Sequence, residues 1–488
     1  MNSEKIKNDL KQSKGITLIA LIITIVVLLI LAGITINGIT GDDSILENAG
    51  KTAENAEYKS LRDEVSLVLT NREINSSKKT FKEDLLDHFD NDEIEEIGNG
   101  LTHVFYVTKN GVSVTVFENG DIENGKVDVW DGRSATVPTL KDDTSKEIHI
   151  TKCSELRWLA NEVNKDEAGT TFAGYTIYLD NNLDFGARQI NGEWEIDENE
   201  DVKWTPIGIA NNANQKFEGI FDGQNHTIKG IYVNYNGNFG GLFGNSYTIN
   251  NLTIKDSYIK GENAVGGIVG ATRNNGSIMN CHNVNTTVKG VSRIGGIIGQ
   301  LSSVTDNSAQ IINCSNTGEI IGTSSWVGGI CASLSNKIDK CYNKGIIIGN
   351  GENLGGVVGG FPTNSNVVIT NCYNIGDVKG IGDGTGTGGI LGWVSVSASS
   401  AIVQNNYNIG KIIGKNDVDG AIGHKTTDKF QISNNYSLKG SSATNLNSIE
   451  KEASEMKTTA FVNTLGNTVW EIVSGKNNGY PVLKWENE

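Results

Sequence analysis

The sequence has few of the residues that staple or stiffen small extracellular folds. Only 4 of its 488 residues are Pro and 6 are Cys, and no C-x-x-C pair occurs. We therefore expect neither a disulfide-rich scaffold nor a structural zinc site. Basic residues are also few: 41 Lys and Arg face 57 Asp and Glu, for a formal net charge of -16. This balance argues against a nucleic-acid-binding protein, whose phosphate contacts need clustered Lys and Arg.

Motifs of well-known catalytic chemistry are also missing. No His starts the H-E-x-x-H signature of a zinc protease, and no G-x-S-x-G turn of a serine hydrolase is present. Four acidic residues could in principle form the carboxylate set of a polysaccharide-cleaving β-helix enzyme: Asp184, Asp222, Asp377 and Asp383. Turn formation explains each of them more simply. We therefore predict no enzyme, no catalytic residue and no cofactor.

Two acidic loops are candidates for calcium. Asp197–Asp201 is rich in oxygen ligands, and Gly382–Gly386 could wrap a cation. Neither loop follows the twelve-residue spacing of an EF-hand. Solvated acidic turns are the favoured interpretation, so we predict no metal site.

One long apolar run dominates the amino-terminal region. Residues Ile16–Ile36 include no charged side chain, and at about 1.5 Å per residue such a helix spans the ~30 Å hydrocarbon layer of a membrane. Lysines precede the run, whereas Asp42, Asp43 and Glu47 follow it. The positive-inside asymmetry puts residues 1–15 in the cytoplasm and everything after Ile36 outside. We expect a single-pass protein of the cell membrane with its bulk at the cell surface.

The junction between the basic segment and the apolar run reads KGITLI over Lys14–Ile19. It resembles the leader of type IV prepilins, in which a basic peptide ends in Gly. The resemblance implies that a prepilin peptidase cuts between Gly15 and Ile16, that Ile16 becomes N-methylated, and that pilin-like subunits are possible partners. The family usually has Glu at the fifth mature position, where this chain has Ala20, which puts polymerisation in doubt. The alternative is a plain single-pass anchor.

A helical stalk and a small head are expected next. Residues 37–75 are rich in Ala, Glu, Lys and Leu near helical spacing, which predicts an extracellular continuation of the membrane helix. Strand-like runs follow at Val104–Val107, Val112–Phe117 and Lys126–Trp130. By the same resemblance, residues 76–130 form a small pilin-like α+β head.

A glycine motif recurs after residue 236. Each copy has two Gly followed by two apolar residues and usually another Gly, and copies are about 26 to 33 residues apart, as expected for stacked supersecondary units. The paired glycines are Gly240 and Gly241, Gly266 and Gly267, Gly295 and Gly296, Gly328 and Gly329, Gly355 and Gly356, and Gly388 and Gly389.

A second phrase alternates with the glycines and reads IINCSN in the copy that starts at Ile311. Its apolar residues alternate with polar ones, as in strands, which predicts a solenoid of parallel strands. One position of the phrase forms a column that we expect to be a buried ladder: Cys281, Cys314, Cys341, Cys372, Asn406 and Asn435. Inward stacking of small residues explains it, and disulfides between adjacent coils are the alternative.

The next position contains Tyr342, Tyr373, Tyr407 and Tyr436, which could be a platform for sugar rings but are more simply explained by packing.

The two phrases together resemble the GLUG-motif repeats of bacterial surface proteins. The resemblance covers about residues 148 to 485 and implies a scaffold without one fixed chemistry. We predict a mainly β protein with a right-handed parallel β-solenoid: a leader (1–15), a transmembrane helix (16–36), a stalk (37–75), a head (76–130), a β-rich lead-in (131–235), the repeats (236–440) and a carboxy-terminal cap on the last coil (441–488).

These features predict a membrane-anchored surface protein with a structural or adhesive role, which displays its solenoid to surfaces, glycans or other cells. A surface glycan or a protein is a possible ligand. Two alternatives stay open. One is a cell-wall or polysaccharide-active enzyme, and the other is a minor pseudopilin of a secretion or pilus-like machine.

Overall fold

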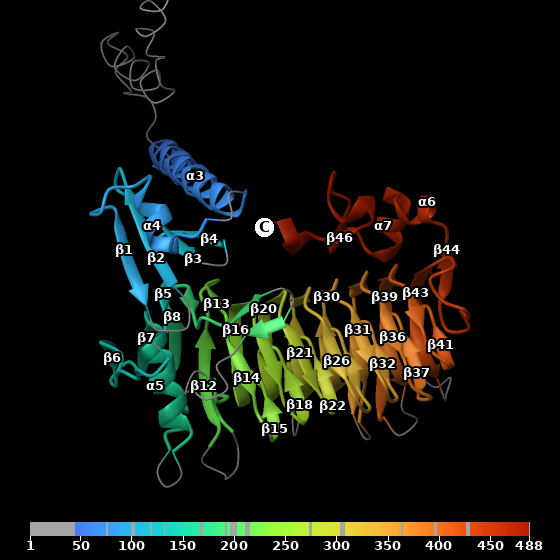
Figure 1. The fold of residues 1–488 in the computed structure, drawn as a ribbon. Helices are drawn as coiled ribbons and strands as arrows, with labels where there is room; N and C mark the ends of the chain where they lie inside the picture. The colour runs from blue at the N-terminus through green and yellow to red at the C-terminus, as the bar shows by residue number, and fades with distance from the viewer. Residues whose placement is uncertain are drawn as a thin grey trace, which may run out of the picture.

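The computed structural model describes residues 44–74, 77–98, 103–117, 120–130, 132–165, 169–190, 193–195, 203–209, 215–272, 276–302, 308–362, 365–394, 398–425 and 430–487 (Figure 1). The predicted leader, the apolar run and the cleavage junction lie outside these residues. None of the helices in the described ranges is long and apolar enough to span a membrane.

The amino-terminal head packs helices against an antiparallel sheet. Its elements are α3 (Ser44–Ile74), α4 (Phe81–Leu86), β1 (Ile94–Gly98), β2 (His103–Lys109), β3 (Val112–Phe117) and β4 (Ile122–Asn124), with sheet order β1-β2-β3-β4. The second half of α3 buries Leu61, Val65 and Val68 in the core that the helix shares with the sheet. The β2–β3 hairpin turns at Asn110 and Gly111, both with positive φ, as a tight two-residue turn requires.

At its carboxy-terminal side the head ends earlier than the predicted residue 130. The run Lys126–Trp130 supplies β5 (Asp128–Val129), which pairs in parallel with β9 (Leu183–Asp184) of the solenoid. Strand pairing across a long sequence distance decides this boundary, and no local pattern reports it.

Most of the chain after the head is a parallel β-solenoid, with four strand segments in most coils. The face that we name the ladder face holds β7 (Glu147–Ile150), β8 (Thr176–Leu179), β9, β12 (Phe217–Asp222), β13 (Thr227–Lys229), the second half of β16 (Phe243–Lys255), β20 (Ile278–Val284), β24 (Gln310–Ile312), β25 (Ser315–Asn316), β29 (Lys337–Asp339), β30 (Tyr342–Asn343), β34 (Asn366–Thr370), β35 (Tyr373–Asn374), β39 (Ser400–Asn408), β43 (Gln431–Leu438) and β44 (Ile449–Lys451).

Three further rows complete the coils. The second row is β14 (Tyr232–Asn234), β17 (Tyr258–Lys260), β21 (Thr287–Gly290), β26 (Ile320–Gly322), β31 (Ile347–Gly349), β36 (Val378–Gly380) and β40 (Ile412–Ile413). The third is β15 (Asn238–Gly240), β18 (Asn263–Gly266), β22 (Ser292–Gly295), β27 (Val327–Gly328), β32 (Leu354–Gly355), β37 (Thr385–Gly388) and β41 (Asn416–Asp419). The fourth is the first half of β16, β19 (Val269–Thr272), β23 (Ile298–Leu301), β28 (Cys331–Leu334), β33 (Val358–Gly360), β38 (Leu391–Val394) and β42 (Ile422–Lys425).

Successive coils stack the repeated phrases in register. Ile278 pairs with Ile311, Ile311 with Ile338, and Ile338 with Ile369. All four side chains are fully buried in one continuous apolar core. The mainly β solenoid predicted from the two phrases is therefore confirmed.

The stack extends beyond the glycine repeats. In the lead-in segment, β7 pairs with β8, β8 with β12 and β12 with β16, all in parallel. The helix α5 (Cys153–Val163) packs its apolar side chains into the same core. A β-ribbon of β10 (Arg188–Ile190) and β11 (Glu193–Glu195) and the strand β6 (Leu140–Asp142), which pairs with β7, complete this region.

Only the first part of the carboxy-terminal segment covers the last coil, and the remainder lies elsewhere. After β44 it forms α6 (Ala453–Met456), α7 (Thr459–Leu465), β45 (Trp470–Glu471), β46 (Val482–Leu483) and the 3-10 turns η1 (Asn477–Gly479) and η2 (Lys484–Asn487). These elements, which we name the strap, run back over the ladder face toward the middle of the solenoid (Figure 1). Residues 444–447, which precede the strap, cover the last coil, where Asn445 Oδ1 accepts the Gly420 amide and the Asn447 amide donates to Asp419.

Candidate functional site

Three columns of side chains run along the ladder face, one on each of three neighbouring positions of the repeated phrase. The predicted ladder residues Cys281, Cys314, Cys341, Cys372, Asn406 and Asn435 are all buried. The Cys314 amide donates to Cys341 Sγ over 3.3 Å, and the Cys372 amide donates to Asn406 Oδ1 over 2.8 Å. Cys and Asn therefore share the column because both accept this inter-coil bond.

All six cysteines of the chain are free thiols. Burial raises the pKa of Cys281 and Cys341 well above the usual value, and raises the pKa of Cys331 to about 12. A thiol that stays protonated at neutral pH is neither a nucleophile nor a metal ligand. Cys314 differs, because hydrogen bonds with the Cys281 and Cys341 side chains hold its pKa below the usual value against the opposing effect of burial. All four thiols of the column are fully buried, so the column packs the coils together.

A second column, which the sequence analysis missed, consists of buried asparagines two residues further along the phrase: Asn283, Asn316, Asn343, Asn374 and Asn408. Asn316 Nδ2 donates to Asn343 Oδ1 over 2.7 Å, and Asn343 Nδ2 donates to Asn374 Oδ1 over 2.8 Å. The recurrence of Asn at this position in five copies was the available signal.

The glycine pairs fit against this asparagine column. The first Gly of each pair ends a third-row strand, as Gly240, Gly266, Gly295, Gly328, Gly355 and Gly388 do. The second Gly faces the next coil, and a Cβ on Gly329 would lie 2.1 Å from the carbonyl oxygen of Gly356 and 2.5 Å from Cγ of Asn343. The double glycine is therefore a consequence of coil spacing.

The third column is aromatic. The rings of Tyr342 and Tyr373 stack with centroids 4.9 Å apart, and those of Tyr373 and Tyr407 stack at 5.2 Å. Tyr373 and Tyr407 are fully buried under the strap, where Trp470 and Phe461 contact them. These two rings are not open to a ligand, so the packing interpretation is confirmed for them.

The strap ends by inserting one ring into this column. In register, His282 is followed by Ser315 and then by Tyr342, so the small Ser side chain leaves a gap between two rings. Trp485 fills the gap and stacks 5.5 Å from His282 and 5.6 Å from Tyr342. Its indole Nε1 donates to the carbonyl of Lys340 over 3.0 Å.

Glu486 fastens the same end of the strap. Both of its carboxylate oxygens accept the Tyr373 hydroxyl at 3.0 Å, and one of them accepts the amide of Leu483 at 2.8 Å. Nζ of Lys344 lies 3.4 Å from the carboxylate. The Glu486 side chain is only 7% exposed, whereas that of Lys344 is 30% exposed.

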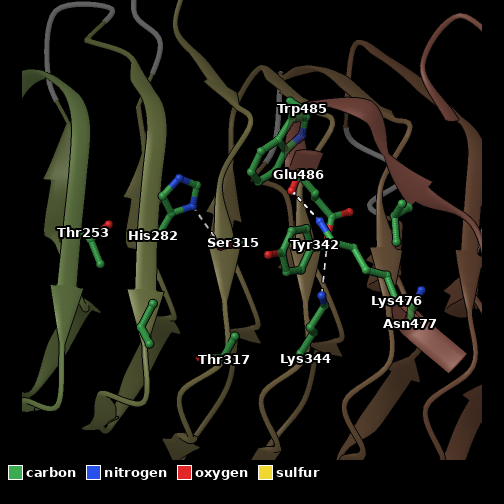
Figure 2. Close-up of a pocket in the computed structure, with 12 residues that line it drawn as sticks. Thr253, His282, Ser315, Thr317, Tyr342, Lys344, Lys476, Asn477, Trp485 and Glu486 are labelled. Atoms are coloured by element: carbon green, nitrogen blue, oxygen red, sulfur yellow. Dashed lines mark hydrogen bonds and ion pairs between the residues drawn. The ribbon is translucent and has the colours of Figure 1, made fainter. Parts of the chain in front are cut away.

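A groove of about 570 Å³ opens beside this junction (Figure 2). The ladder face supplies its floor with Thr253, His282, Ser315, Thr317, Tyr342 and Lys344. The strap supplies its wall with Lys476, Asn477, Val482, Trp485 and Glu486. The volume lies within the ~300–1,000 Å³ typical of small-molecule sites.

The electrostatics of the groove follow from burial. Burial lowers the pKa of His282 below its ordinary 6.5 and raises the pKa of Tyr342 to about 12, so both rings are neutral at pH 7. His282 Nδ1 lies 2.9 Å from Ser315 Oγ. The charged groups are the ammonium groups of Lys344 and Lys476 and the carboxylate of Glu486.

The four acidic residues considered for catalysis do not form a set. Asp184 pairs with Arg188 at 2.5 Å, and Asp222 accepts the amide of Gln224. The other two lie in later coils, where Asp377 accepts the Lys411 amide and Asp383 pairs with Lys415.

Only one of the two acidic loops considered for calcium lies within the described residues. The loop Asp197–Asp201 falls outside the described residues, and in Gly382–Gly386 the carboxylate of Asp383 lies 2.5 Å from Lys415. Across the described part of the chain, no three His, Cys, Asp or Glu side chains are arranged to hold a metal ion.

Comparison with known proteins gives limited matches. No family model matches the chain. A 99-residue stretch, 20% of this chain, is 39% identical to halomucin of Haloquadratum walsbyi and spans 1% of that protein's length. A crystal structure of a candidate immunoglobulin A1 protease from Bacteroides ovatus matches with a TM-score of 0.49 and 20% identity, over 71% of this chain and 94% of that chain. Neither match assigns an activity to this chain.

Proposed function

We propose that the chain is a membrane-anchored bacterial surface protein with a structural or adhesive role, whose solenoid is displayed outside the cell. The observation that carries the proposal is the long parallel solenoid with a single continuous core, covered at its last coil and strapped along one face. Such a rod holds a surface away from its anchor without needing a catalytic centre. The stretch shared with halomucin is compatible with a surface repeat protein.

The amino-terminal part of the proposal rests on the sequence. The KGITLI junction and the uncharged run Ile16–Ile36 support cleavage between Gly15 and Ile16, N-methylation of Ile16 and a single membrane span. The partners are then the prepilin peptidase, the membrane and, if a filament forms, pilin-like subunits.

Three measurements test the proposal. In cells that retain a prepilin peptidase, the mass of the amino-terminal peptide of the membrane-extracted protein is expected to correspond to methylated Ile16, and an intact Met1 would refute processing. External protease added to whole cells is expected to digest the solenoid, and full protection would refute surface display.

Truncation before Thr40 should release the protein from the membrane fraction, so its retention there would contradict the single anchor.

A further inference from the structure

We propose that the groove between the strap and the ladder face binds an acidic sugar unit of a glycan. The inference deepens the proposed adhesive role and rests on it. Two segments far apart in the chain build the site: the Trp485 indole bonds to Lys340, 145 residues away. The groove therefore exists only in the folded chain with the strap in place (Figure 2).

The first argument is charge. The protein has a net charge of -16, yet the groove is lined by two ammonium groups and one carboxylate. That carboxylate, on Glu486, is nearly buried and faces the Tyr373 hydroxyl, whereas the Lys344 side chain is 30% exposed. Lys476 is exposed, and among the described residues its ammonium group donates to two neutral oxygens, the carbonyl of Glu486 and Oδ1 of Asn487. The charge that a ligand meets is therefore positive.

The second argument is the polar floor. Thr253, Ser315 and Thr317 line the groove with hydroxyl groups, and His282, on the coil between those of Thr253 and Ser315, adds a neutral imidazole. Such groups both donate and accept hydrogen bonds, which matches the hydroxyl-rich edge of a sugar. A simple inorganic anion would use the lysines and leave this floor without a role.

The third argument concerns what the site lacks. His282 and Tyr342 stack on Trp485 from either side, so the indole faces are not open to a sugar ring. Recognition then depends on the carboxylate or sulfate of the sugar, which would lie at Lys344 and Lys476, and on hydrogen bonds to the floor. Acidic sugars should consequently bind in preference to neutral ones.

The test is calorimetric titration of the full chain, purified in detergent, with trigalacturonic acid. A sulfated trisaccharide is a second anionic arm, maltotriose is the neutral control, and acetate is the control for a plain anion. We expect both anionic sugars to bind at least about tenfold more tightly than maltotriose or acetate, and their affinity to fall with added salt. Equal binding of maltotriose, equal binding of acetate, or no binding of either anionic sugar would overturn the proposal.

Variants localise the binding. Lys344→Gln and Lys476→Gln should each weaken trigalacturonic acid severalfold or more, whereas Lys415→Gln, an exposed lysine paired with Asp383 on another part of the surface, should change it by less than about twofold. Lys476 is exposed and outside the core, so its variant tests the site even if Lys344→Gln loosens the strap. An equal loss in Lys415→Gln, or no loss in Lys476→Gln, would contradict the site. Because the titration uses purified protein, its failure leaves surface display and leader cleavage untouched.

Discussion

At the scale of single residues, each coil packs on the next through close contact between the second glycine of the motif and a buried asparagine. Asn343 donates to Gly345 O at 2.8 Å and accepts from Gly345 N at 3.2 Å, so it bonds its own turn as well as the next coil. The second glycine of the neighbouring motif, Gly329, lets this buried amide approach. The glycine motif and the second repeated phrase therefore recur together because their residues contact each other.

Replacement of Gly329 by Ala should be strongly destabilising. The added Cβ would lie 2.1 Å from a backbone oxygen of the next coil, and overpacking of this kind costs about 3 kcal/mol. Gly360→Ala is the matched control, because its Cβ would meet nothing closer than the Trp326 ring at 3.3 Å. Chemical denaturation measures both, and equal midpoints for the two variants would contradict the steric account.

Replacement of Asn343 by Ala should also be costly. It leaves Asn316 Nδ2, Asn374 Oδ1 and the polar backbone groups of Gly345 without their partner, which predicts a loss of about 3 kcal/mol. Asn366→Ala removes a surface bond to Ser400 and should cost under about 0.5 kcal/mol. Thermal unfolding compares the two, and a small effect for Asn343→Ala would show that the column does not hold the coils.

The sequence indicated part of this residue-scale picture. Recurrence at Cys281, Cys314, Cys341 and Cys372 pointed to an inward column, because a small apolar side chain fits no exposed strand position. The asparagine column recurred as clearly, but an isolated Asn predicts a turn. Only the coil spacing turns these side chains inward to bond one another.

At the scale of elements, the strap is the feature that changes the ladder face. Its segment from Ala453 to Asn487 carries Phe461, Trp470, Tyr480 and Leu483, which bury against the tyrosine column. The carbonyl of Pro481 accepts the Tyr407 hydroxyl. The strap thus converts an exposed aromatic row into a core and leaves a groove where it ends.

The docking of the strap end should depend on pH through His282. Burial, the largest influence, lowers the pKa of His282 in the docked state, while the nearby Cys314 side chain opposes that shift. When the strap detaches, the pKa of His282 returns toward its ordinary 6.5, so the detached state binds more protons than the docked state. Docking therefore weakens as the pH falls below about 6.5, and this contribution to docking is fully present above that pH. One proton changes the docking equilibrium by at most about tenfold per pH unit.

Hydrogen exchange of residues 477–487 at pH 7.5 and 5.5 measures this effect. His282→Phe keeps a ring against Trp485 but does not titrate, so its exchange, corrected for intrinsic rates, should be independent of pH in this range. The same acid-induced loosening in that variant would show that another group is responsible.

The position of the strap could not be predicted, and the reason is distance along the chain. Proximity in sequence predicts that the carboxy-terminal segment caps the last coil, because that coil directly precedes it. Trp485 lies between His282 and Tyr342, because Ser315 has no ring and leaves a space that one aromatic ring can fill. A vacancy of one ring in a stack is visible only when the coils are in register.

At the scale of the whole molecule, a charge cluster with buried cations and partly exposed carboxylates joins the head to the solenoid. The β3–β4 hairpin brings Phe117, Asp121 and Glu123, and the solenoid brings Arg188 and Lys229. Lys229 Nζ lies 2.5 Å from Glu123 and 3.4 Å from Asp121. Both cations lie over the Phe117 ring, at 4.4 Å and 5.0 Å from its centroid. The head and the rod are therefore held in a defined relation.

Lys229→Met should loosen this junction. The Lys229 side chain is 6% exposed, and loss of one partner from a buried ion pair costs about 3 kcal/mol or more. Lys126→Met removes an exposed pair with Glu95 on the same head and should cost under about 1 kcal/mol. Faster hydrogen exchange in β3 and β4 is expected for Lys229→Met only. Equal exchange in both variants would show that the cluster does not hold the head.

The sequence by itself determined the repeat and its strand type, because glycine pairs and alternating apolar residues act over a few neighbouring positions and every copy repeats them. It also determined the uncharged run Ile16–Ile36 and the chemical character of the cysteine column. Tertiary structure decided where the head ends, how far the parallel stack extends and where the strap lies. Each of these depends on contacts between residues far apart in the chain, such as β5 with β9 and Trp485 with His282. Such contacts are chosen by burial and register in the assembled coils, which no local pattern encodes.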